Sequence, residues 1–211
     1  RLRNGSYKDV FADIYEHNGW RGELSRSGSG SEPTQTRSVT AGLEQIFADY
    51  SIKSVLDVPC GDFCWMSQVN LQGIEYLGGD IVPALIQDNT ERYPKPNVRF
   101  EQIDLLKGGL PTADLVVCRD ALVHFSNADI AIALRSIRDS GARWLLATSF
   151  TKTTRNTNIA TGQIRLLNMQ LPPVRMPQPE RTIWEDADPG VRPGKAAMLW
   201  RVDSIDAALG T

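Results

Sequence analysis

Acidic residues close three of the short apolar segments in this sequence, and such carboxylates could bind a ligand. Asp57, Asp80 and Asp104 stand at these ends, and the glycine loop Val58–Phe63 follows the first of them. Asp80 comes nineteen residues after Gly61 (80 − 61), a distance at which an acidic residue can accept hydrogen bonds from a ribose diol. The carboxylate of Asp104 could accept a hydrogen bond from an adenine amino group. Together the three positions predict a nucleoside-binding edge of a sheet.

The residues of the glycine loop discriminate between two nucleoside cofactors. A dinucleotide requires glycines that let its pyrophosphate approach a helix N-terminus. This loop has Pro59, Gly61 and Phe63 instead, and it carries Asp62, whose charge would repel a phosphate. S-adenosylmethionine (SAM) has no phosphate and carries a sulfonium and an ammonium cation, which carboxylates at Asp57 and Asp62 would suit. The loop therefore favours SAM over NAD.

A histidine and an aspartate after the fourth apolar segment are candidates for acid–base chemistry. His124 follows Asp120 by four residues, so in a helical segment the two side chains would lie one turn apart on one face. His124 could then act as general base for a hydroxyl acceptor, with Asp120 orienting it or stabilising its charge. Two other interpretations stay open: a structural role for His124, and a divalent cation bound by Asp120. Because no tight carboxylate cluster surrounds Asp120, no metal is predicted.

Short apolar segments alternate with helical patterns through the middle of the chain, as parallel strands alternate with their connecting helices. The expected strands are Ser54–Val58, Glu75–Gly79, Val98–Ile103, Asp114–Cys118 and Arg143–Ser149, followed by a terminal hairpin of Arg181–Glu185 and Ala196–Val202. After two N-terminal helical segments, one helix is expected to begin near Pro83. Another is expected to run from Asn127 to Ser140, with Asn127 as its N-terminal cap. The expected fold is α/β: a Rossmann-like, doubly wound, mostly parallel seven-stranded sheet with a C-terminal antiparallel hairpin and an N-terminal helical lid.

The order of these motifs resembles the class I SAM-dependent methyltransferases. Val55–Phe63 looks like their first motif, in a variant in which Pro59 replaces the first glycine, and the resemblance spans about residues 38–150. It implies a SAM site in which the backbone around Gly61 holds the methionine part and Asp80 holds the ribose. At the other strand ends it implies contacts with the adenine and with the ammonium group, from Ile81, Asp104, Leu105 and the Arg119 backbone.

The two ends of the chain resemble a narrower group, the bacterial methyltransferases found with polysaccharide- and sugar-modifying enzymes. The similar segments are Trp20, Ser27–Ser31, Gln35–Thr36, Asn168–Pro173 and Met198–Arg201. This resemblance implies that the Ser/Gly segment is a lid over the cofactor rather than a linker, with hydroxyls and backbone N–H groups that hold the SAM carboxylate. The cofactor residues that it adds are Trp20, Arg26, Ser31 and Thr36. A mobile surface loop is the alternative.

The prolyl, polar segment Thr151–Glu180 follows the fifth strand, where a loop that shapes the acceptor site would lie. Its neutral polar side chains suit hydroxyl groups, and aromatic residues elsewhere could stack on a sugar ring. The predicted acceptor residues are Tyr15, Trp65, Thr151, Asn156, Gln163 and Asn168. The sequence thus favours methylation of a saccharide hydroxyl. A small non-sugar metabolite as acceptor, or a domain that binds SAM without catalysis, stays open.

The composition of the chain argues against several other classes of protein. The 211 residues are 41% hydrophobic and 23% charged, as in a soluble globular protein, and a net charge of −2 argues against nucleic-acid binding through a large basic field. The apolar runs are shorter than a membrane span, and three cysteines without a CxxC pair suggest reduced thiols in the cytoplasm. We expect one domain over residues 1–211, with a lid (1–37), a SAM-binding core (38–150), a substrate loop (151–180) and a terminal hairpin (181–211). A homodimer is left open.

Overall fold

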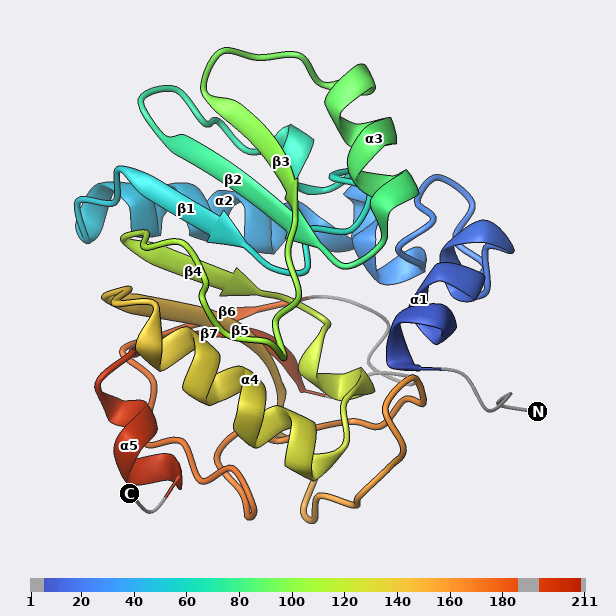
Figure 1. Ribbon diagram of the computed structural model, residues 1–211. Helices are drawn as coiled ribbons and strands as arrows, with labels where there is room; N and C mark the ends of the chain where they lie inside the picture. Colours follow the sequence, from blue (N-terminus) through green and yellow to red (C-terminus); the bar gives the residue numbers. More distant parts are fainter. Residues whose placement is uncertain (1–5, 186–193, 210–211) are drawn as a thin grey trace.

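The computed structural model describes residues 6–185 and 194–209, and its centre is a seven-stranded sheet. The strands lie in the order β3-β2-β1-β4-β5-β7-β6 (Figure 1). Their bounds are β1 (Ser54–Asp57), β2 (Glu75–Asp80), β3 (Val98–Gln102), β4 (Leu115–Cys118), β5 (Trp144–Phe150), β6 (Arg181–Trp184) and β7 (Lys195–Arg201). Strands β1 to β5 pair in parallel, and β7 pairs antiparallel with both β5 and β6. The predicted mostly parallel sheet with a terminal antiparallel hairpin is confirmed.

The inner strands are easy to locate because they are buried on both faces and therefore form continuous apolar runs. All four residues of β4 are buried, as are the first six residues of β7. Every strand boundary predicted from the sequence, including those of the more exposed edge strands β3 and β6, lies within one residue of the boundary in the structure.

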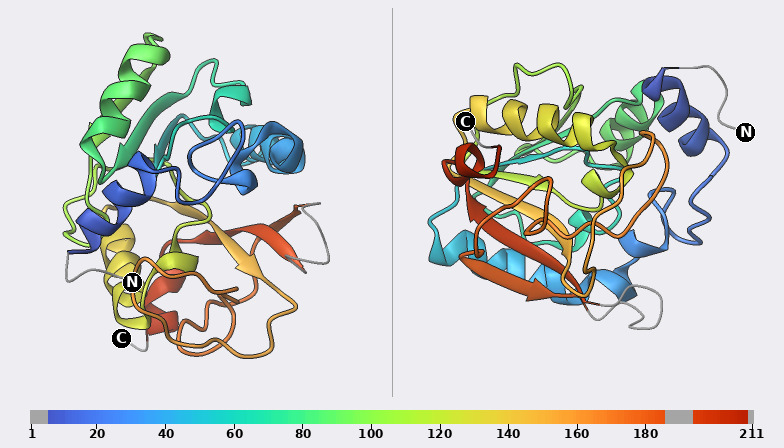
Figure 2. Two further views of the ribbon diagram at one scale, coloured as in Figure 1. Left: turned by 90° about the vertical axis from the view of Figure 1, so that its right-hand side faces the viewer. Right: turned by 90° about the horizontal axis from the view of Figure 1, so that it is seen from below.

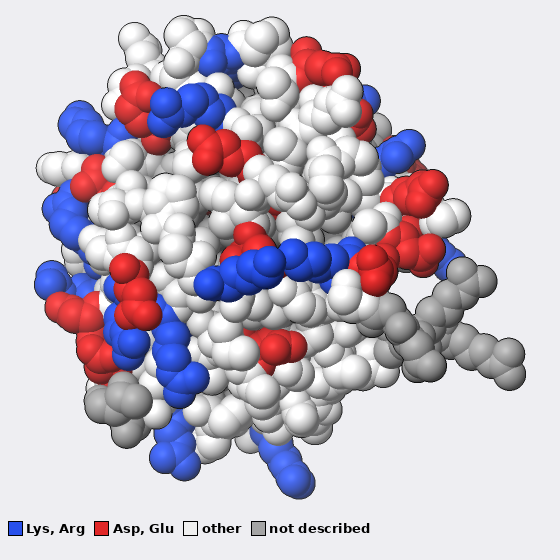
Figure 3. All heavy atoms as spheres, viewed as in Figure 1, with Lys and Arg blue, Asp and Glu red and all other residues white. Residues whose placement is uncertain are grey.

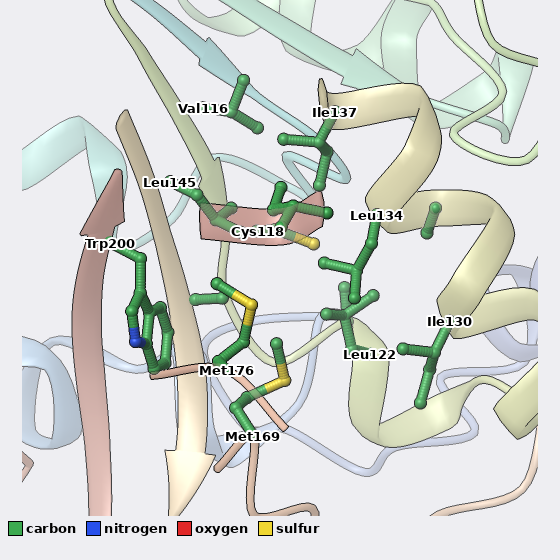
Figure 4. Close-up of a cluster of buried hydrophobic side chains, with 14 of the residues drawn as sticks. Val116, Cys118, Leu122, Ile130, Leu134, Ile137, Leu145, Met169, Met176 and Trp200 are labelled. Carbon is green, nitrogen blue, oxygen red and sulfur yellow. The ribbon is translucent and has the colours of Figure 1, made fainter. Parts of the chain in front are cut away.

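Helices cover both faces of the sheet, as a doubly wound fold requires. They are α1 (Tyr7–Glu16), α2 (Pro33–Asp49), α3 (Pro83–Arg92), α4 (Asn127–Asp139) and α5 (Ser204–Leu209), with short 3₁₀ turns at Ser29–Ser31, Met66–Gln68 and Leu122–His124. On one face, α4 buries Leu134 and Ile137 against Val116, Cys118 and Leu145 of the sheet (Figure 4). On the other face, α2 buries residues such as Leu43 and Ile46 in a separate apolar cluster.

Two local predictions are wrong. The cap of α4 is Ser126, whose hydroxyl accepts a hydrogen bond from the Asp129 N–H, rather than Asn127. Asp120 and His124 do not lie one turn apart in a helix, because Asp120 has a φ of 53° and only Leu122–His124 forms a 3₁₀ turn. A positive φ is uncommon for a residue other than glycine and interrupts a helix. The chain therefore bends at Asp120, immediately after β4.

The strand order reverses between β1 and β4, and in open α/β sheets this is the point where ligands bind, beyond the carboxyl ends of the strands. Figure 2 (left) looks onto this edge of the sheet, with α1 lying across it.

Positive and negative side chains are interspersed on the face shown in Figure 3. Among the helices of the described residues, none is long and apolar enough to cross a membrane.

Candidate functional site

A cavity of about 280 Å³ opens at the carboxyl ends of the parallel strands. The loops after β1 to β4 form one side of its wall, and α1 with the Ser/Gly segment 27–31 forms another. The predicted site residues that line it are Tyr15, Trp20, Ser31, Pro59, Gly61, Trp65, Asp80, Ile81, Asp104, Leu105, Arg119, Asp120 and His124. The structure thus brings cofactor candidates and both acid–base candidates to one cavity. Other predicted residues lie outside its lining: Arg26, Thr36, Asp57, Asp62, Thr151, Asn156, Gln163 and Asn168.

The loop after β1 approaches the Ser/Gly segment very closely. Gly61 has a φ of 55°, and a Cβ at this position would overlap the Ser27 hydroxyl. Glycine is required here for both reasons. Phe63, the departure from the usual glycine pattern, is buried against the rings of Tyr76 and Phe100. The segment that approaches Gly61 closely is therefore the Ser/Gly segment, through Ser27.

Asp62 holds the Ser/Gly segment in place. Its carboxylate accepts hydrogen bonds from the Ser25 hydroxyl (3.0 Å), the Arg26 N–H (2.8 Å) and the Ser27 hydroxyl (3.1 Å). Its own N–H donates to the Ser27 hydroxyl (2.9 Å). The Arg26 guanidinium lies 5.4 Å from the centre of the Tyr15 ring. These contacts hold residues 25–27 against the loop after β1, so Asp62 shapes the cavity from behind its wall.

Asp80 presents a buried carboxylate at the end of β2. It accepts hydrogen bonds from the N–H groups of Gly61 (3.2 Å) and Val82 (3.1 Å). Burial raises its pKa to about 6, against the effect of these N–H groups. A carboxylate has about four lone-pair sites, so Asp80 can accept further hydrogen bonds from a ligand. Asp57 lies deeper, where it accepts a hydrogen bond from the Tyr76 hydroxyl (2.8 Å), and burial raises its pKa to about 7.

Helix α1 is held at the cavity by its contacts with Asp104, which follows β3. The Asp104 carboxylate accepts a hydrogen bond from the Tyr7 hydroxyl (2.8 Å) and pairs with the Lys8 ammonium group (3.0 Å). Partial burial would raise the pKa of Asp104, but the contacts with Lys8 and Tyr7 outweigh it and lower the pKa. The Tyr15 hydroxyl donates to Asp88 of α3 (2.6 Å). Tyr7 and Lys8 could not be recognised as site residues from the sequence, because only the folded chain brings them to the end of β3.

His124 is partly buried in the cavity wall beside an aromatic ring. Its ring centre lies 5.2 Å from that of Trp20, and Nδ1 lies 3.1 Å from the carbonyl oxygen of Gln163. Burial lowers the pKa of His124, although the Gln163 carbonyl and the charge of Asp120 raise it. A carbonyl oxygen can only accept, so this contact favours the neutral tautomer with the proton on Nδ1 and a lone pair on Nε2. That tautomer is the one a general base requires.

Four charged side chains form a cluster at the cavity wall, in which Arg119, Glu185 and Lys195 are buried and Asp120 is partly exposed. Arg119 donates to Glu185 through Nη2 (2.5 Å) and Nε (3.3 Å), and Lys195 lies 3.0 Å from Glu185 and 2.6 Å from Asp120. Arg119 also donates to the carbonyl of Gly30 (2.8 Å). The cluster joins the end of β4, the hairpin strands and the Ser/Gly segment. Glu185 and Lys195 are not among the residues predicted from the sequence, because their contacts join segments far apart in the chain.

The polar side chains of the predicted substrate loop mostly hold the loop itself. The Asn156 amide donates to the carbonyl of Asn168 (2.8 Å), and the Asn168 amide donates to the carbonyl of Thr153 (3.1 Å). The Thr151 hydroxyl donates to the carbonyl of Gly194 (3.1 Å) and the Gln163 side chain accepts from the Ala160 N–H (3.0 Å). Three other loop residues line the cavity, namely Ile164, Arg165 and Leu166.

Within the described part of the chain, no group of three or more His, Cys, Asp or Glu side chains could hold a metal ion. Asp120, the predicted alternative ligand, pairs with the cations of Arg119 (3.3 Å) and Lys195.

Comparison with known proteins identifies the class of fold. Residues 55–141 match the family model of a methyltransferase domain, and no curated protein matches the sequence. Magnesium protoporphyrin IX methyltransferase from Synechocystis PCC 6803, solved with bound SAM, is similar with a TM-score of 0.63 and 14% identity over 94% of this chain and 98% of that chain. The 1,6-didemethyltoxoflavin-N1-methyltransferase of Burkholderia thailandensis, solved with S-adenosylhomocysteine (SAH), gives 0.66 and 16% over 92% and 86%.

The chain thus has the Rossmann-like fold of SAM-dependent methyltransferases, and the match falls on the predicted core. The SAM and SAH in these neighbours agree with the cofactor predicted from the sequence. The residues of the cavity also fit such a group. Asp80 retains acceptor capacity for a ribose diol, Ile81 and Leu105 offer apolar contact, and the Ser27 hydroxyl takes the place beside Gly61 that a pyrophosphate would need.

The affinity for SAH is expected to depend on pH through Asp80. Its pKa of about 6 means that the carboxylate, the stronger acceptor, forms as the pH rises through 6. SAH binding should therefore tighten between pH 5 and 7 and level off above, which calorimetry at constant ionic strength can measure. Asp80→Asn should weaken binding about 10- to 100-fold at pH 7.5, because a hydrogen bond to a charged group contributes about 1.5–3 kcal/mol.

Asp80→Asn should also flatten the rise between pH 5 and 7, whereas Asp139→Asn, at an exposed carboxylate of α4, should leave both affinity and pH profile unchanged. A rise that persists in Asp80→Asn would assign the titration to another group.

Proposed function

We propose that this protein is a SAM-dependent methyltransferase that methylates a hydroxyl group of a saccharide, with His124 as general base. The observation that carries the proposal is the position of His124 in the same cavity wall as Asp80, with Nδ1 at the Gln163 carbonyl. Asp80, Gly61, Ile81, Asp104 and Leu105 would hold the cofactor. When bound, SAM supplies an electrophilic methyl group that a nucleophile displaces in line.

The residues of the chain would have two tasks in this reaction. The first is to hold the acceptor in line with the methyl group, an effect worth up to about 7–11 kcal/mol in ideal cases. Trp20, which lines the cavity, offers a face on which a sugar ring can stack, whereas Trp65 is buried with the Arg119 guanidinium over its ring. The second is to remove the hydroxyl proton. Nε2 of His124 would take this proton, and the negative charge of Asp120, which raises the pKa of His124, would stabilise the imidazolium that forms.

A small aromatic metabolite is the second candidate acceptor. Several aromatic side chains line the cavity, among them Phe11 of α1, Trp20 in the segment after α1, and Phe125 in the segment after β4. Flat aromatic molecules suit such a wall as well as sugars do. The named acceptors of the two structural neighbours are a porphyrin and a toxoflavin precursor rather than saccharides. Cytoplasmic location and a single domain stay predictions, and a homodimer stays open.

Transfer of the labelled methyl group of SAM to a panel of acceptors tests this proposal. We expect an oligosaccharide or a monosaccharide to be labelled, and the labelled position to be an oxygen by mass spectrometry. Labelling of aromatic metabolites alone would select the second candidate. An absence of labelling in a protein that binds SAM would favour a domain that binds the cofactor without catalysis.

A further inference from the structure

Arg165 is a buried cation in the cavity wall with unfilled hydrogen-bonding capacity. The residue is 8% exposed and lines the cavity together with His124. Its Nη1 donates to the carbonyls of Phe125 (2.7 Å) and Val123 (3.3 Å). Its Nε and Nη2 are buried, and neither has a hydrogen-bond partner among the described residues. A buried guanidinium in this condition is unfavourable, because charges that leave water are normally paired.

The other charged side chains of the cavity wall have ion-pair or hydrogen-bond partners for their charged groups. Asp104 pairs with Lys8, Arg119 pairs with Glu185, and Asp120 pairs with Lys195. The Asp80 carboxylate accepts hydrogen bonds from two backbone N–H groups. Arg165 has no carboxylate partner within the described part of the chain. Burial lowers its pKa with no opposing interaction. The wall therefore carries a positive charge that the described residues do not neutralise.

This charge lies beside the proposed base. Residues 123–125 and 162–165 run next to each other, since the Arg165 N–H donates to the Val123 carbonyl (3.1 Å) and the Gly162 N–H donates to the His124 carbonyl (2.8 Å). His124 and Arg165 thus reach the cavity from neighbouring segments, so a group held at Arg165 would lie beside the proposed base. In the reaction, a group held at Arg165 would belong to the acceptor.

We propose that Arg165 binds an anionic group of the acceptor, a carboxylate or a phosphate, and so selects an acidic molecule. This inference rests on the proposed function and narrows it to acidic saccharides. Guanidinium forms two parallel hydrogen bonds with either anion. Because Nε and Nη2 are covered in the structure, the guanidinium must turn into the cavity to meet the anion, and its bonds to Val123 and Phe125 are the contacts that it exchanges.

Proton–nitrogen NMR of the full chain, saturated with SAH, tests this proposal directly at Arg165. The Nε–H signal of Arg165 is identified by its loss in Arg165→Gln. The probes are glucuronate, glucose 6-phosphate and neutral glucose, with sodium chloride at matched ionic strength. We expect a saturable shift of this signal with at least one acidic sugar, at a dissociation constant at least tenfold below that of glucose. A response to only one acidic sugar separates carboxylate from phosphate.

The controls distinguish failure of this inference from failure of the proposed function. Arg155→Gln, at an exposed arginine of the same loop, should leave the response unchanged, whereas Arg165→Gln should remove the preference for acidic sugars and leave SAH affinity within twofold. Equal responses to acidic and neutral sugars, or none to any probe, would overturn the inference. A full shift on adding SAH alone would assign Arg165 to the cofactor carboxylate and overturn it as well. Failure to bind SAH would contradict the proposed function, independently of the anion response.

Discussion

Glu185→Ala is expected to lower the free energy of unfolding by about 3–5 kcal/mol, the usual effect of removing one partner of a buried ion pair. The Glu185 and Lys195 side chains are 0% and 1% exposed, and that of Arg119 is 2% exposed. Without Glu185, the two cations would have only the partly exposed Asp120 as a carboxylate partner within the cluster. Arg119 would also lose the contacts that hold it at the Gly30 carbonyl. Urea denaturation at pH 7 measures the change.

A second substitution tests whether charge is the cause. Replacing Lys195 by methionine in the Glu185→Gln background removes one cation for the carboxylate already lost. We expect this second substitution to recover most of the free energy of unfolding that Glu185→Gln alone removes. Asp203→Asn is the matched control, because Asp203 pairs with Arg201 on the surface, and it should leave the urea midpoint unchanged. If Glu185→Ala proved no more destabilising than this control, the cluster would not contribute to stability as described.

His124→Asn is expected to slow methyl transfer by about 10²–10⁴-fold and to leave SAH affinity within twofold. The range is that of a general base, and the asparagine amide can still donate to the Gln163 carbonyl as His124 does. The pH dependence of kcat/KM provides a second signature. Burial lowers the pKa of His124, and only neutral imidazole accepts a proton. The rate should therefore fall as the pH falls, with a midpoint below the usual histidine range.

Steady-state kinetics with the acceptor found in the panel checks both effects. His17→Asn is the matched control, since His17 is exposed at the end of α1. It should change neither turnover nor the acidic limb of the profile. Unchanged turnover in His124→Asn would exclude His124 as the base, and the acceptor would then need another proton acceptor in the cavity.

The framework of the site could be predicted because it depends on local pattern. Buried strands form apolar runs, and parallel strands end at one edge, so Asp80 and Asp104 necessarily lie near one another. The departures in the glycine loop were also informative, although their structural reason was hidden. Gly61 makes room for Ser27, a residue thirty-four positions earlier (61 − 27), and Phe63 fills an aromatic cluster.

What could not be predicted depends on contacts between distant segments. Asp62 was assigned to the cofactor because a carboxylate suits a cation, yet in the structure it accepts hydrogen bonds from Ser25 and Ser27. Glu185 meets Arg119 only because the hairpin packs beside β5. The segment Thr151–Glu180 contains several arginines among its neutral polar residues, and its composition could not indicate that Arg165 is buried in the cavity wall without a carboxylate.

Titration calorimetry with SAM and SAH measures cofactor binding, on which every role proposed for the cavity depends. We expect both ligands to bind one site per chain with dissociation constants in the micromolar range or below, and Asp80→Asn to weaken both. Asp139→Asn should bind like the unaltered protein. If a folded protein bound neither ligand at micromolar concentrations, the cavity would not be a SAM site.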